Sequence, residues 1–115
     1  MTGYLYINNG TIEFIESEDT PNLKELQTLV GGYIESVPAF ESWTVYANEE
    51  GRIHNLPASC VIINVQEWVI YGPVVILGRV DEDGDETLLV KDVALALVTY
   101  LRIIPKGIVV KLRNP

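Results

Sequence analysis

Apolar and polar residues alternate along several segments of the chain, and the first two such segments lie close together. Residues 4–7 and 11–15 flank the sequence Asn8-Asn9-Gly10. Asparagine and glycine tolerate the positive φ angles that a tight turn needs, so this pattern predicts a hairpin. A similar alternation over residues 108–112 predicts a closing strand near the carboxyl end.

The hydrophobic period lengthens in residues 23–30, where leucine and valine recur on one face of a helix. Thr20 suits an N-cap and Pro21 suits the first helical position, so we expect the helix to begin there. Gly31 or Gly32 supplies the left-handed residue that ends a helix. We therefore expect Gly31 and Gly32 to have structural roles.

Strands are expected after this helix. Segments 33–37 and 43–47 are rich in aromatic and β-branched residues. The apolar run that opens segment 74–80 indicates a strand that is buried on both faces and central in its sheet. Gly72 and Pro73 precede it as structural residues, because proline cannot donate a hydrogen bond to a ladder.

Residues 56–66 have two interpretations. The run Val61-Ile62-Ile63 favours a strand, whereas Pro57-Ala58-Ser59 also suits the start of a short helix.

The remaining segments are an acidic turn and a second helix. Residues 81–85 form the turn, with Gly84 as its structural residue, and residues 86–89 return as a strand. Helical spacing over 91–102 predicts the helix, which Pro105 ends. This order of elements predicts an α+β fold in a single domain over residues 1–115. We expect a largely antiparallel sheet of about six to seven strands with about two helices packed on one face.

Composition narrows the class of protein. The chain has 115 residues, 48% of them hydrophobic, and one cysteine, so it can build a core but no internal disulfide. No apolar run approaches the roughly 18 residues of a membrane span. The opening Met1-Thr2-Gly3-Tyr4 does not resemble a signal peptide. We expect no membrane association and a cytoplasmic location.

The net charge of −8 is unevenly distributed. Residues 1–50 contain nine acids and one base, whereas residues 102–115 contain four bases and no acid. An acidic surface repels phosphate, so a nucleic-acid partner is not expected. The basic end is either a solvated surface or a contact for phosphate or an acidic partner.

No residue pattern indicates catalysis, a metal or a cofactor, and we expect none. His54 and Cys60 form a nucleophilic pair only if the loop between them folds back; otherwise Cys60 is a core residue and His54 faces a partner. In the acidic turn, placing Gly84 at the sixth position of a calcium-binding loop puts Arg79 first and Val90 twelfth. Neither residue is a calcium ligand.

Aromatic residues on the strands suggest a binding face. Trp43, Val45 and Ala47 share one face of a strand, so Tyr46 lies outside if that face is the core. Exposed tyrosines beside acids suit protein binding. The alternative is a two-sided sheet that loops partly cover. The candidate binding residues are Tyr46, Glu49, Glu50, His54 and Asn55.

Three blocks of sequence occur in a recognisable order. They are Leu-Gln-Thr-Leu-Val-Gly-Gly-Tyr-Ile-Glu (26–35), Asn-Glu-Glu-Gly (48–51) with Leu-Pro (56–57), and Tyr-Gly-Pro-Val-Val-Ile-Leu-Gly (71–78). This pattern resembles the family known as domain of unknown function 3846. The resemblance implies an accessory protein of phages, plasmids or other mobile elements that acts inside a bacterial host cell. It implies no established activity.

Several functions stay open. The leading hypothesis is a small non-enzymatic protein that binds a host or phage protein and modulates a host process or defence. One alternative is a ligand-binding protein or enzyme that uses the His54–Cys60 loop. Another is an acidic DNA mimic that inhibits a nuclease. Assembly into a homo-oligomer is also open.

Overall fold

A computed structural model describes residues 1–8, 10–51 and 53–103 of the protein. The helices in these ranges are α1 (Leu23–Val30), α2 (Lys91–Leu97) and a short 3-10 helix, η1 (Val98–Tyr100). The strands are β1 (Thr2–Asn8), β2 (Thr11–Glu16), β3 (Ile34–Ser36), β4 (Thr44–Asn48), β5 (Ala58–Asn64), β6 (Gln66–Tyr71), β7 (Val74–Leu77), β8 (Leu89–Val90) and β9 (Leu101–Ile103).

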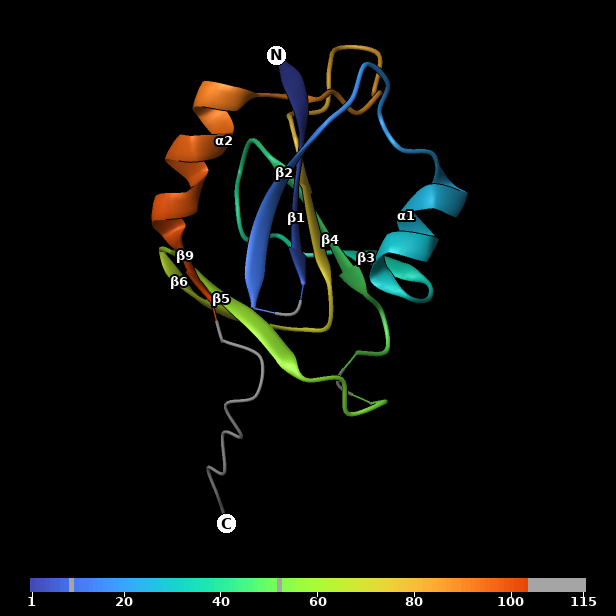
Figure 1. Ribbon diagram of the computed structural model, residues 1–115, viewed down its shortest axis with the longest axis vertical. Helices are drawn as coiled ribbons and strands as arrows, with labels where there is room; N and C mark the ends of the chain where they lie inside the picture. The colour runs from blue at the N-terminus through green and yellow to red at the C-terminus, as the bar shows by residue number, and fades with distance from the viewer. Residues whose placement is uncertain (9, 52, 104–115) are drawn as a thin grey trace.

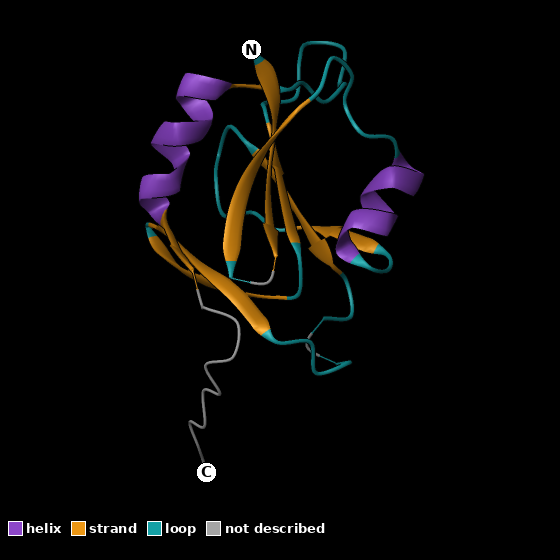
Figure 2. Cartoon of the chain, viewed as in Figure 1, coloured by secondary structure: helices purple, strands orange, loops and turns teal. Residues whose placement is uncertain are grey.

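These strands form two antiparallel sheets. The larger sheet has six strands in the order β2-β1-β7-β4-β3, with β8 paired to β1. The smaller sheet has the order β6-β5-β9. The α+β class and the largely antiparallel six-stranded sheet are confirmed (Figure 2). The second sheet was not expected.

Strand β7 is the centre of the larger sheet. It pairs with β1 on one side and with β4 on the other, and all four of its residues are buried. The prediction of a central strand buried on both faces is therefore confirmed. The strand ends at Leu77, three residues earlier than expected; beyond it the Gly78 N–H donates to the Thr87 carbonyl at 2.8 Å, so this segment pairs with the residues that follow the acidic turn.

The two helices cover opposite faces of this sheet. Leu26 and Val30 of α1 pack on Val75 and Leu77, whereas Ala94 and Leu97 of α2 share a cluster with Val74 and Ile76. Successive residues of a strand point to opposite faces. The expected placement of both helices on one face is therefore wrong, as Figure 1 shows. Because β7 has apolar side chains on both faces, a helix must pack on each face to bury them.

Helix α1 begins later than expected. Asn22, rather than Thr20, is the N-cap: its side chain accepts a hydrogen bond from the Glu25 N–H, and the Glu25 carboxylate accepts one from the Asn22 N–H. This reciprocal pair is a capping box, which satisfies two free amides at once. At the other end, Gly31 has a φ of 83° and is the left-handed residue of the cap.

The carboxyl-terminal part of the chain differs from its prediction. Residues 58–64 are strand β5, so the helical alternative for this segment is wrong. Helix α2 ends at Leu97, and Leu101, expected on the helix, belongs to β9. The expected strand over 108–112 lies outside the described residues. Within the described ranges, no helix has the length and apolar character needed to cross a membrane.

Candidate functional site

The first two sequence blocks meet at Asn48, the last residue of β4. A Cβ atom on Gly32 would lie 2.8 Å from Asn48 Nδ2, closer than side chains approach one another. Gly32 is therefore needed for close packing rather than for a positive φ. The first block of residues thus lies directly against the second.

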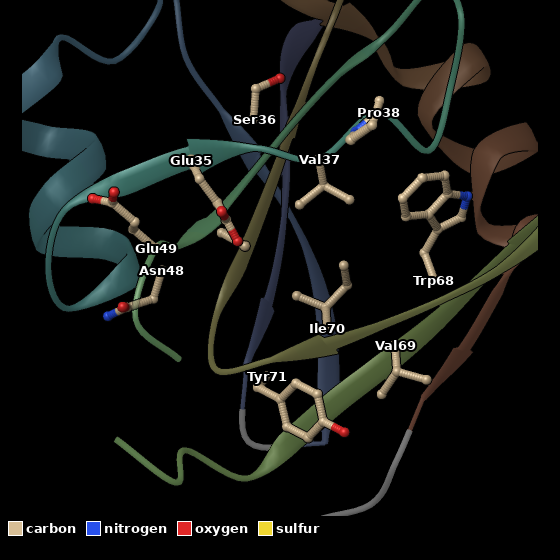
Figure 3. A pocket seen from close by; sticks show the side chains of 11 residues that line it. Glu35, Ser36, Val37, Pro38, Asn48, Glu49, Trp68, Val69, Ile70 and Tyr71 are labelled. Carbon is tan, nitrogen blue, oxygen red and sulfur yellow. The ribbon is translucent and has the colours of Figure 1, made fainter. Parts of the chain in front are cut away.

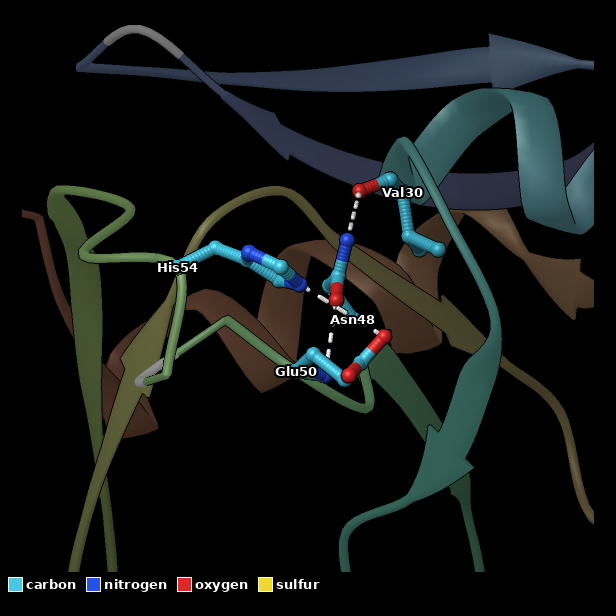
Figure 4. A network of polar contacts seen from close by, with 4 residues as sticks. All are labelled: Val30, Asn48, Glu50 and His54. Atoms are coloured by element: carbon cyan, nitrogen blue, oxygen red, sulfur yellow. Dashed lines mark hydrogen bonds and ion pairs between the residues drawn. The ribbon is translucent and has the colours of Figure 1, made fainter.

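The Asn48 side chain is buried and holds two loops together. Its Nδ2–H donates to the Val30 carbonyl at 3.2 Å, and its Oδ1 accepts from the Glu50 N–H at 2.8 Å (Figure 4). A buried amide with both ends bonded fixes the groups around it, because leaving either end unpaired is costly. Asn48 thereby joins the end of α1 to the turn that follows β4.

The third block packs against the same turn. A Cβ on Gly51 would lie 2.4 Å from the Tyr71 carbonyl oxygen. The Gly72 N–H donates to the Pro57 carbonyl at 2.9 Å. Gly72 also has a φ of 89°. All three blocks therefore converge on the loop between β4 and β5, where Gly32 and Gly51 permit the close approach.

One hollow lies on the α1 side of this loop. It has a volume of about 390 Å³ and is lined by Gln27, Gly31, Gly32, Tyr33, Asn48, Glu50 and His54. His54 Nε2 lies 3.6 Å from Glu50 Oε1, and the imidazole is 62% exposed. Two of the sequence-predicted binding residues, Glu50 and His54, therefore lie together. Asn55 follows them in the turn with a φ of 56°.

A second hollow is a groove between β3 and β6, each of which is an edge strand of its own sheet. Its volume is about 320 Å³. Figure 3 shows Glu35 of β3 and Val37, the residue after β3, pointing towards the side where Trp68 and Ile70 rise from β6. The groove is lined by Glu35, Ser36, Val37, Pro38, Ala47, Asn48, Glu49, Trp68, Val69, Ile70 and Tyr71. The candidate residue Glu49 belongs to this groove.

The groove has an apolar floor and an acidic rim. Trp68, Val37 and Ile70 pack against the core between the sheets. Glu35 and Glu49 are exposed, and no lysine or arginine is among the described residues that line the groove. Sequence reasoning missed this groove, because its two sides come from segments about thirty residues apart in different sheets. The only sequence signal is the alternation of Glu35 and Val37 with their neighbours.

Tyr46 lies outside both hollows. It is half-buried against the cluster beneath α1, and burial followed by its hydrogen bond to Glu86 raises its pKa to about 12. Tyr4 and Tyr6 pack against the same cluster, and the Tyr6 hydroxyl donates to the Leu29 carbonyl at 2.7 Å. These tyrosines support α1 and do not form an exposed row.

The acidic turn is a structural hairpin. Asp81 Oδ1 accepts hydrogen bonds from the N–H groups of Asp83 and Asp85, both at 2.9 Å, and Val80 pairs with Glu86. Gly84 has a φ of 84° in this turn. In the described part of the chain, no three His, Cys, Asp or Glu residues are grouped so as to hold a metal ion.

Cys60 and His54 lie in different surroundings. Cys60 is fully buried in the core between the sheets, whereas His54 is on the surface. Burial raises the pKa of the Cys60 thiol to about 11. A protonated thiol is a poor nucleophile. The structure therefore does not bring the two residues together as a nucleophilic pair.

Native Cys60 is expected to resist thiol reagents. At pH 8 its thiolate fraction falls about a hundredfold below that of a free thiol, because the pKa rises from 9.0 to about 11. Labelling with a chromogenic disulfide, with and without denaturant, measures this. The stability gained from the protonated thiol is present below pH 9.0 and is lost as the pH rises through about 11. Labelling in native buffer at the rate of the unfolded chain would contradict the buried position.

Comparison with known families identifies the chain. The family described as "Domain of unknown function (DUF3846)" matches residues 1–102. The protein belongs to this family. The match includes all three blocks that meet at the β4–β5 loop. No curated protein and no solved structure matches this DUF3846 chain.

Proposed function

We propose that this DUF3846 protein is a small non-enzymatic accessory protein that binds a segment of a host or phage protein in the groove between β3 and β6. The observation that carries the proposal is the groove itself, with its apolar floor and acidic rim. Concave apolar surfaces with a few polar groups are the usual binding sites of proteins. The phage or mobile-element setting, in the cytoplasm of a bacterial cell, rests on the resemblance of the three blocks.

Exposed apolar side chains beside the groove support a protein partner. Val69 is 47% exposed on β6, and in Figure 3 Val69 and Tyr71 project to the side of β6 opposite Trp68 and Ile70. Aromatic and aliphatic side chains contribute most of the binding energy in protein interfaces. The sequestered thiol of Cys60 weighs against a covalent mechanism in the loop that ends at β5.

Affinity capture with a matched pair of variants tests the proposal. Val69→Asp places a charge on β6 at a residue of the groove lining, whereas Val93→Asp places the same charge on α2, outside that lining. The two valines are comparably exposed, at 47% and 37%. Wild type and Val93→Asp should retain the same protein from a bacterial lysate, and Val69→Asp should lose it.

Two outcomes would overturn the proposal. One is equal retention by all three proteins; the other is no specific retention by the wild type. Circular dichroism and melting temperatures must agree among the three proteins, so that a loss of binding is not a loss of folding. Binding in the hollow at His54 instead would show as sensitivity to His54→Ala with no effect of Val69→Asp.

A further inference from the structure

We propose that the partner segment binds in an extended conformation, as an added strand on β3. On the face that looks into the groove, the segment presents a lysine or arginine and, two residues away, an apolar side chain. This inference rests on the proposed function, because it describes the occupant of the same groove. It follows from the hydrogen bonds of β3, the direction of its side chains and the charge around it.

Among the described strands, none pairs with the outer edge of β3. The Glu49 N–H donates to the Tyr33 carbonyl at 2.8 Å, and the Val37 N–H donates to the Val45 carbonyl at 2.8 Å. In an antiparallel ladder, alternate residues direct their main-chain groups to the same neighbour. The main-chain groups of Ile34 and Ser36 therefore point away from β4, where the sheet ends. A free edge of this kind is a template for another strand.

The side chains of β3 specify what the added strand carries. Residues that lie directly opposite each other in a ladder project to the same face. Glu35 and Val37 project into the groove, whereas Ser36 projects away from it (Figure 3). A residue opposite Glu35 therefore meets a carboxylate, and a residue opposite Val37 meets the apolar floor beside Trp68.

Charge selects a basic partner over an acidic one. Glu35 and Glu49 are both exposed in the groove lining. The whole chain carries 16 acids and eight bases, a net charge of −8. An acidic surface of this kind attracts cationic segments and repels anionic ones.

Amide hydrogen exchange with a designed peptide tests the inference. The peptide Thr-Lys-Thr-Val-Thr-Lys-Thr-Val-Thr, blocked at both ends, presents lysine and valine on one face in either direction. On binding, exchange at the Ile34 and Ser36 N–H groups should slow, because these groups become donors to the peptide. The same peptide with glutamate in place of lysine should not bind. Raising the salt from about 0.05 M to about 0.5 M should weaken binding.

Two variants with a matched control separate charge from strand pairing. Glu35→Lys should weaken binding of the lysine peptide about fivefold or more at low salt. Ser36→Pro removes an outward N–H and should weaken binding about tenfold. Glu16→Pro is the control: the Ser17 N–H donates to the Thr2 carbonyl, so the Glu16 N–H points outward from β2, the opposite edge of the sheet. It should bind like the wild type.

The outcomes distinguish this inference from the proposed function. If the lysine peptide binds without slowing exchange at Ile34 and Ser36, or if Ser36→Pro folds normally and binds it fully, strand addition is wrong. Equal binding of the glutamate peptide would refute the charge preference. If no peptide binds while Val69→Asp still abolishes capture of a lysate protein, the groove is a binding site for a folded surface, and only the extended occupant is refuted. Binding of a peptide of residues 104–115 in place of an outside segment would make the occupant the chain's own end.

Discussion

Gly51→Ala is expected to lower the free energy of unfolding by about 3 kcal/mol, because overpacking against a fixed backbone is costly. The added Cβ would lie 2.4 Å from the Tyr71 carbonyl oxygen and 3.2 Å from its carbon. Neither atom is the end of a flexible side chain, so either β6 or the β4–β5 loop must move. Chemical denaturation of both proteins measures the change.

Gly84→Ala is the matched control for this prediction. Gly84 has a φ of 84°, and nothing lies within 4 Å of an added Cβ. Alanine there should cost only the strain of a left-handed residue, about 1 kcal/mol. If Gly51→Ala costs no more than Gly84→Ala, the contact between the second and third blocks is looser than described. A melting temperature of Gly51→Ala equal to that of the wild type would refute the close approach.

The elements that follow a local rule could be predicted from the sequence. The β1–β2 hairpin follows from its turn residues, and the central position of β7 follows from its unbroken apolar run. The end of α1 follows from Gly31. The start of α1 was predicted wrongly because both Thr20 and Asn22 suit an N-cap. Asn22 is the N-cap because the Glu25 carboxylate, three residues later, completes a capping box with it.

What depends on contacts between distant segments could not be predicted. Helix α2 was expected to continue through Leu101, but pairing with β5 draws that residue into β9. The second sheet that results supplies β6, and β6 supplies one side of the groove. Helical spacing in 91–102 contains no information about this pairing. The groove therefore appears only when the two sheets are placed together.

The three sequence blocks have a structural role. Gly32 and Gly51 permit close packing at the end of β4 and in the β4–β5 loop, and both hollows are lined in part by residues of that loop. Both hollows include Asn48 in their lining. A recognisable block is thus a support for the surface beside it, on which the candidate binding residues Glu49, Glu50 and His54 are exposed.

Asn48→Ala is expected to lower the free energy of unfolding by about 2 to 3 kcal/mol, because it leaves two polar groups without partners. These are the Val30 carbonyl and the Glu50 N–H. Denaturant unfolding gives the magnitude. A loss of unfolding free energy no larger than that of a typical surface substitution would mean that water replaces both hydrogen bonds.

A double-mutant cycle with Gly32 isolates the packing part of this effect. In the wild type, Gly32→Ala places a Cβ 2.8 Å from Asn48 Nδ2 and should be destabilising. With alanine at position 48 that clash is absent, so the same substitution should cost less. Equal costs in the two backgrounds would show that Gly32 is required for another reason.

Asn48→Asp gives the same contact a pH dependence of known sign. The carboxylate still accepts from the Glu50 N–H, but its second oxygen faces the Val30 carbonyl instead of donating to it. Burial and this repulsion raise the pKa of the new carboxyl above the usual value of about 3.9. A raised folded pKa means that the variant approaches wild-type stability below about pH 4 and loses stability as the pH rises through the folded pKa. Unfolding of both proteins at pH 4 and pH 7 measures the difference, and a gap that narrows at the higher pH would contradict the hydrogen bond to Val30.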